Sequence, residues 1–149
     1  MKKLLLLFVA ALTLASCDTD DDYSSNFTYG VLPTEVADIP EGMEVGKIYR
    51  ITVDYIRPTD CYSFYTLDYK RSTEDIEDAS GELIDTQVRT IAVINRIFIE
   101  DDCEELDVTT QVYFDFEPIS EGPYVFRFWV GEDEDGEDIF LEYETVVLE

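Results

Sequence analysis

The sequence of 149 residues contains no histidine, and only 10 lysine and arginine residues stand against 35 aspartate and glutamate residues. The absence of histidine removes the usual general base at neutral pH, the imidazole metal ligand and the Ser-His or Cys-His nucleophile pair. Catalysis by carboxylates alone, as in glycoside hydrolysis, needs one pair in a cleft, and no pair is distinguished among these acids. We therefore predict a protein that is not an enzyme and that uses no cofactor or metal.

Basic side chains are too few to bind nucleic acid. The net charge of −25 repels phosphate backbones and keeps the protein soluble. The chain nevertheless carries ten tyrosines and nine phenylalanines, which is ample material for a core. We expect a folded acidic domain with no nucleic-acid partner.

Long apolar runs are missing except at the start of the chain. Residues 4–14 form an apolar stretch behind Lys2 and Lys3, and this stretch is roughly half the ~20 residues that cross a bilayer as a helix. A short apolar segment after basic residues is typical of a secretory signal peptide. We therefore predict that residues 1–16 are removed, which leaves 133 residues with a net charge of −27, enough for one domain.

Cys17 follows this segment directly. Leu14-Ala15-Ser16-Cys17 resembles the lipobox of bacterial lipoproteins. The resemblance implies that the Cys17 thiol takes a diacylglyceryl group, that cleavage occurs just before it, and that the new amino terminus is acylated. More than one acyl chain makes membrane anchoring stable, so we expect a membrane anchor at Cys17.

An acidic run comes next. Asp18-Thr19-Asp20-Asp21-Asp22 resembles the signal that sends many Bacteroidota lipoproteins to the outer face of the outer membrane. An aspartate directly after the cysteine also resembles the inner-membrane retention signal of enterobacterial lipoproteins, and the acids could simply form a solvated tether. The further aspartates favour export. We expect residues 17–27 to be a flexible acidic tether, with the protein lipid-anchored in the outer membrane and facing the cell exterior.

The remaining residues, 28–149, are expected to form one all-β domain. Apolar and polar residues alternate with the period of half-buried antiparallel strands at 47–56, 107–117, 124–130 and 138–148. Further strands are expected at 62–69, at 86–100, and near 27–33 or 35–38. We expect residues 72–85 to be a long loop that contains one helical turn. Six or seven strands at this spacing predict an antiparallel β-sandwich.

The segment around Tyr124 resembles immunoglobulin-like domains. Gly122, Tyr124 and Phe126 match the start of the sixth strand in such domains, with Ser120 where an acid often lies. The resemblance implies that the tyrosine hydroxyl bonds backbone at the corner while its ring packs in the core. Phe126 occupies the place of the cysteine of true immunoglobulin domains, and no tryptophan follows the second strand. The resemblance therefore implies an immunoglobulin-like β-sandwich of about seven strands outside the antibody superfamily.

Two cysteines remain once Cys17 is lipidated. An exported protein with one leftover pair most simply forms a disulfide, here between Cys61 and Cys103. Antiparallel strands cross the domain once, so successive connections alternate between its ends, and 57–61, 100–107 and 131–138 should share one end. We expect the two cysteine Cα atoms to lie roughly 4.4 to 6.8 Å apart.

The acidic segment 131–138 should therefore lie near the disulfide. Its Asp133, Asp135 and Asp138 offer oxygens that calcium accepts. However, Gly131 occupies the first ligand position of an EF-hand loop, and glycines in this segment suit a hairpin turn. We favour a solvated acidic turn over a calcium site.

These features indicate a function in binding. A rigid domain with a lipid tether, acidic loops and no catalytic set predicts a non-enzymatic binding or interaction module at the cell surface. Its ligand would be a protein or a carbohydrate, with Trp129 and nearby tyrosines as candidate contacts. The alternative is a structural or accessory component of an outer-membrane envelope assembly.

Overall fold

A computed structural model describes residues 26–99 and 102–149, so the predicted signal peptide, Cys17 and most of the predicted tether lie outside the described residues. The described residues form nine β-strands. They are β1 (Phe27–Leu32), β2 (Thr34–Asp38), β3 (Gly42–Glu44), β4 (Tyr49–Thr59), β5 (Tyr62–Glu77), β6 (Leu83–Phe98), β7 (Glu105–Phe116), β8 (Gly122–Glu132) and β9 (Asp138–Leu148). Within this part of the chain no helix is long and apolar enough to cross a membrane.

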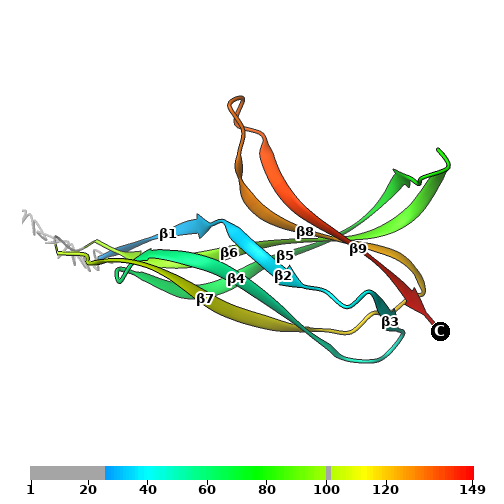
Figure 1. Ribbon diagram of the computed structural model, residues 1–149, viewed down its shortest axis with the longest axis horizontal. Helices are drawn as coiled ribbons and strands as arrows, with labels where there is room; N and C mark the ends of the chain where they lie inside the picture. Colours follow the sequence, from blue (N-terminus) through cyan, green and yellow to red (C-terminus); the bar gives the residue numbers. More distant parts are fainter. Residues whose placement is uncertain (1–25, 100–101) are drawn as a thin grey trace, which may run out of the picture.

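The strands form two sheets, and the all-β prediction is confirmed (Figure 1). Sheet A has the order β1-β6-β8-β9-β3, with β5 also paired to β6, and sheet B has the order β2-β4-β7. Sheet B is antiparallel, but sheet A is mixed, because β6 pairs with β8 and β3 with β9 in parallel. The prediction of a purely antiparallel fold is wrong for these two pairs. After β6 the chain passes through β7 in sheet B and returns to sheet A as β8, so β8 runs in the same direction as β6.

Both sheets contribute one apolar face to a single core. The alternation predicted for β4 and β8 holds, since Ile51 and Val53 of sheet B and Phe126 and Phe128 of sheet A are fully buried. The Phe116 and Phe126 rings meet edge to face across the two sheets at 5.1 Å between centroids. Aromatic pairs in this geometry add to the burial of apolar area, so the sheets are held together mainly by these inner faces.

Tyr124 makes the contacts expected at a tyrosine corner. Its ring is fully buried against Phe116. Its hydroxyl group donates a hydrogen bond to the Ser120 backbone oxygen at 3.2 Å and lies 3.0 Å from the Ser120 hydroxyl. The phenolic group therefore fixes the β7–β8 connection onto the core without leaving a buried polar atom unpaired.

The prediction of a long loop with a helical turn over residues 72–85 is wrong. These residues complete a hairpin of two 16-residue strands, β5 and β6, around a turn at residues 78–82. The turn sequence Asp78-Ala79-Ser80-Gly81-Glu82 closes with a hydrogen bond from the Asp78 N–H to the Glu82 oxygen at 2.8 Å. Gly81 adopts φ +85°, a left-handed conformation that glycine takes without steric cost.

The β8–β9 turn repeats the same chemistry. Asp133-Glu134-Asp135-Gly136-Glu137 has the matching hydrogen bond from the Asp133 N–H to the Glu137 oxygen at 2.9 Å, and Gly136 has φ +82°. In both turns the first aspartate accepts two backbone N–H groups further along the turn. The pattern Asp-x-x-Gly-Glu, which occurs twice, is the signal that could have revealed the β5–β6 hairpin from sequence.

The acidic β8–β9 turn does not lie at the disulfide end, contrary to the prediction. Parallel pairing of β8 with β6 stops at the Phe128–Ile91 pair, and β1 takes the place beside β6 from Val93 onward. Beyond Phe128, strand β8 is therefore paired only with β9, and this hairpin leaves the sheet as a projecting arm (Figure 1). Its tip stands apart from the end where the β4–β5 and β6–β7 connections meet.

Candidate functional site

A concave site lies between the outer edges of the two sheets. We call it the aromatic cleft; its volume is about 500 Å³, within the range of about 300–1,000 Å³ typical of ligand pockets. Its walls come from β5 in sheet A and β7 in sheet B, with the β7–β8 connection at one end. The lining residues are Phe64, Tyr65, Thr66, Leu67, Tyr69, Arg71, Arg89, Tyr113, Phe114, Asp115, Phe116, Glu117 and Ile119.

Strand pairing explains why the cleft is open. β5 and β7 are edge strands, each paired on one side only, so no other strand of the described residues closes the gap between the sheets. Leu67 of β5 packs against the core, and Tyr69, which is 38% exposed, meets Phe114 of β7 at 5.8 Å between ring centroids. Exposed aromatic groups gather at this edge, with Tyr65 49% and Tyr113 57% exposed. Apolar surface of this kind on a soluble domain is a common mark of a binding site.

One wall of the cleft is fixed by an ion pair on sheet B. Arg50 donates to Asp115 through Nε at 3.1 Å, and its guanidinium lies 4.1 Å from the centre of the Tyr113 ring. Both charged groups are largely exposed, so the ion pair itself contributes little stability. Its effect is to hold the Tyr113 ring at the rim and to occupy the Asp115 carboxylate.

The other wall carries two arginines. Arg89 on β6 is 3% exposed; its Nη1 donates to the Val88 oxygen at 2.8 Å, while its Nε has no hydrogen-bond partner among the described residues. The Arg89 guanidinium lies 5.0 Å from the Tyr124 ring centre and 6.0 Å from that of Phe116. Arg71 on β5 is exposed. The cleft therefore combines aromatic walls with positive charge in a strongly acidic protein.

Tyr69 adds a polar group to the same wall. Partial burial raises the pKa of the Tyr69 hydroxyl above its ordinary value, while the charges of Arg89 and Arg71 act in the opposite direction. The hydroxyl group is therefore protonated at neutral pH and can donate a hydrogen bond.

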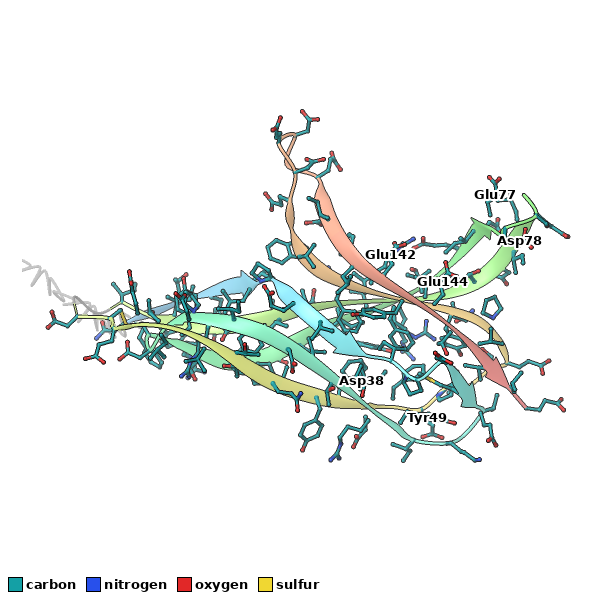
Figure 2. The ribbon with its side chains drawn as sticks, viewed as in Figure 1. Asp38, Tyr49, Glu77, Asp78, Glu142 and Glu144 are labelled. Carbon is teal, nitrogen blue, oxygen red and sulfur yellow. A yellow bond between two sulfur atoms is a disulfide. The ribbon has the colours of Figure 1, made fainter. Side chains whose placement is uncertain are left out.

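A second, smaller groove lies between the β5–β6 hairpin and β9. It has a volume of about 340 Å³ and is lined by apolar groups and by Glu41, Glu77, Asp78 and Glu144. Figure 2 shows Glu77 and Asp78 at the tip of the hairpin and Glu142 and Glu144 on β9. These four acids are solvent-exposed. Hydrogen bonds within its own turn, first of all from the Ser80 hydroxyl, hold the pKa of Asp78 below its ordinary value.

Arg127 joins the two hairpins at the edge of this region. It donates to Glu74 of β5 at 2.7 Å and to Glu142 of β9 at 2.6 Å. The hydrogen bond from Arg127 holds the pKa of Glu74 below its ordinary value, and a further one from Ser72 acts in the same direction. The arrangement connects β5, β8 and β9 through side-chain hydrogen bonds.

The predicted disulfide is present at the opposite end of the molecule. Cys61 and Cys103 are bonded, with Cα atoms 5.6 Å apart, inside the expected range. Asp60 lies beside the two sulfur atoms, but thiols joined in a disulfide offer no thiolate to a metal. Asp60 instead accepts a hydrogen bond from the Glu104 N–H at 2.9 Å, which ties the β4–β5 and β6–β7 connections together.

The other predicted contact residues lie outside the cleft. Trp129 lines a separate depression of about 180 Å³ formed with strands of sheet A, and its indole N–H donates to Asp138 at 2.8 Å. Asp133 uses one carboxylate oxygen to accept the Asp135 and Glu137 N–H groups of its own turn. The structure therefore separates Trp129 from the tyrosines of the cleft.

The fold and the cleft together define a two-sheet all-β domain with an aromatic, partly cationic groove at an open sheet edge. Comparisons with protein-family models, curated proteins and solved structures found no match. The function must therefore be argued from the site itself.

Proposed function

We propose that this chain is a lipoprotein, anchored through Cys17 in the outer membrane and facing the cell exterior. The signal-like residues 1–16 and the sequence Leu14-Ala15-Ser16-Cys17 support the anchor. The first described residues enter the fold beside the disulfide, since the Ile99 N–H donates to the Asn26 oxygen and Phe27 pairs with Phe98. A tether at this end would direct the disulfide toward the membrane and the projecting hairpins away from it (Figure 1).

The domain is best described by an immunoglobulin-like sandwich. The corner formed by Tyr124 and Ser120 and the two sheets around one core support this proposal. The parallel β6–β8 pair departs from the antiparallel sheets of that family, and nine strands exceed the seven expected. The proposal therefore concerns the layer architecture and the corner, with a strand order particular to this chain.

As a surface-anchored domain, the protein acts as a non-enzymatic binding module. The observation that carries this function is the aromatic cleft, an open groove lined by aromatic residues from both sheets, some of them exposed at its rim. Rigid aromatic groups supply large contact areas at low cost in conformational entropy, which suits recognition of a protein or carbohydrate ligand.

Native protein purified from cells is expected to begin at Cys17 and to carry a diacylglyceryl group with a further acyl chain. Intact-protein mass spectrometry measures this directly. A Cys17→Ser variant is the control and should retain its leader and lose membrane association. Unmodified Cys17 together with an intact leader in the native protein would refute the anchor.

Loss of exposed rings is expected to weaken ligand retention. Full chain in lipid nanodiscs would be incubated with protein and polysaccharide fractions from the surface of the producing cells. The double change Tyr65→Ser and Tyr113→Ser should reduce retention by about tenfold or more, because each lost aromatic contact costs about 0.5–1.5 kcal/mol.

Trp129→Ser is the matched control, since it removes an aromatic side chain from the other surface. Retention should be unchanged in this variant. Equal retention by the double variant and the unmodified chain contradicts a role for the cleft. If the protein co-purifies with an outer-membrane assembly, and the Tyr65→Ser and Tyr113→Ser changes do not alter this association, the accessory role would be favoured instead.

A further inference from the structure

Two arginines of the aromatic cleft lie directly opposite each other on neighbouring strands. Arg71 of β5 and Arg89 of β6 are register partners in the antiparallel hairpin. Side chains in this relation have Cβ atoms about 4.5–5.5 Å apart, and like charges placed there destabilise a sheet. Acids outnumber basic residues 35 to 10, yet all ion pairs within residues 26–99 and 102–149 involve other basic side chains. Neither arginine therefore has an anionic partner among the described residues.

Burial makes the missing counter-ion more costly at Arg89. Arg89 is only 3% exposed, and its Nε–H group has no hydrogen-bond partner among the described residues. Contacts with two aromatic rings, and hydrogen bonds from Nη1 to the Val88 oxygen and from Nη2 to the Gln87 side-chain oxygen at 3.4 Å, offset part of the cost. A buried cation normally requires a paired anion as well. Arg89 borders the cleft volume, so an anion can approach from that side.

We propose that Arg71 and Arg89 bind the carboxylate of a small organic ligand whose apolar part packs against the rings of the aromatic cleft. This inference rests on the binding function proposed for the cleft, and it assigns the cleft a small carboxylate ligand in place of the protein or carbohydrate considered above. Two guanidinium groups offer several donors to a planar carboxylate, and the Tyr69 hydroxyl adds another donor. The cleft volume of about 500 Å³ accommodates a ring system beyond the charged group.

The charge of the protein restricts the ligand to low negative charge. A net charge of −25 repels anions at a distance, and more strongly as their charge increases. Asp115 and Glu117 also line the cleft. Asp115 is bound to Arg50, while Glu117 is exposed and forms no ion pair with either cleft arginine. A monocarboxylate with an aromatic or aliphatic body can pair with the two arginines, and its single negative charge keeps its repulsion by Asp115 and Glu117 small.

The test compares three naphthalene probes on the full chain in lipid nanodiscs, with empty nanodiscs as reference. Calorimetry would measure the affinity of 2-naphthoate, of neutral 2-naphthamide and of dianionic 2-naphthyl phosphate, and amide chemical shifts would locate each bound probe. We expect 2-naphthoate to bind about tenfold or more tightly than the amide, because charge-assisted hydrogen bonds are the stronger kind. The shifts should fall on residues 64–71 and 113–119, and the phosphate should bind more weakly than 2-naphthoate.

Substitutions connect this preference to the arginines. Arg71→Gln and Arg89→Gln should each reduce the preference for naphthoate over naphthamide, and the double variant should abolish it. Lys70→Gln is the matched control, because Lys70 lies next to Arg71 on β5 but lines a different depression. If Arg89→Gln fails to fold, Arg71→Gln on the exposed strand decides the question.

The outcomes separate this inference from the proposed function. Equal affinity for naphthoate and naphthamide, with shifts in the cleft, overturns the carboxylate site and leaves cleft binding intact. A preference that survives in both arginine variants, or no binding of any probe, also overturns it. Tighter binding of the phosphate would overturn the restriction to a monocarboxylate.

Discussion

Replacing Cys61 and Cys103 by alanine is expected to lower the free energy of unfolding by about 4 kcal/mol. The disulfide joins residues 42 apart in sequence, and the loop it closes restricts the unfolded chain far more than the folded one. Next to it, Asp60 and Glu104 are joined by two hydrogen bonds, from the Asp60 N–H to the Glu104 oxygen and from the Glu104 N–H to the Asp60 carboxylate. Urea denaturation of the variant and the unmodified protein measures the difference.

Reduction of the unmodified protein provides the control. Adding dithiothreitol should shift its urea midpoint toward that of the double alanine variant and leave the variant itself unchanged. A decrease of less than about 1 kcal/mol would show that the rest of the fold already restricts this end, contrary to the chain-entropy argument.

Phe126→Ala is expected to cost about 3–5 kcal/mol, through lost apolar burial and the cavity that remains. The Phe126 ring is fully buried and lies edge to face with Phe116 of the other sheet. Removing it weakens the contact between the sheets as well as the packing within sheet A. Thermal and urea denaturation followed by near-ultraviolet circular dichroism reports this loss.

Phe64→Ala makes the same chemical change at a ring that is 41% exposed on the edge strand β5. Because less apolar area is buried there, it should cost about 1.5 kcal/mol or less. Similar losses in the two variants would mean that Phe126 is not a special contact between the sheets. Native domains typically have a free energy of unfolding of about 5–15 kcal/mol, so the Phe126→Ala variant should keep only a small part of its stability.

The sequence pattern predicted strands well where one face is polar. Strands β4, β7, β8 and β9 agree with the predicted segments to within a few residues, because alternation is enforced by burial on one side. The same argument failed for residues 72–77, where both faces of β5 are polar or only half covered. Backbone pairing to β6 holds this segment extended, and side-chain polarity cannot report such pairing.

The position of the cysteines could also be inferred, since successive crossings of the domain bring their two connections together. The same counting misplaced the acidic β8–β9 turn. It assumed that every strand runs the full length of its sheet, whereas β8 leaves the sheet where β1 replaces it beside β6. Competition between two strands for one edge is a tertiary effect with no local sequence signal.

The candidate site could not be predicted for a related reason. Tyr69 and Phe114 are far apart in sequence and meet only because β5 and β7 are the open edges of two sheets on the same side of the core. The opposition of Arg71 and Arg89 depends on the hairpin register, which the repeated Asp-x-x-Gly-Glu turn would have fixed. Trp129, the aromatic residue that the sequence indicated as a contact, lies outside the cleft.

The sequence by itself determined the all-β character, most strand positions and the cysteine pairing, because the period of burial and the number of cysteines are local properties of the chain. The signal peptide at residues 1–16 and the lipid anchor at Cys17 remain predictions from the sequence. Tertiary structure alone decided the mixed strand order, the two projecting hairpins and the aromatic cleft with its paired arginines. Each of these depends on which strand edges are paired and which stay open, and edge pairing is settled by competition among segments distant in sequence.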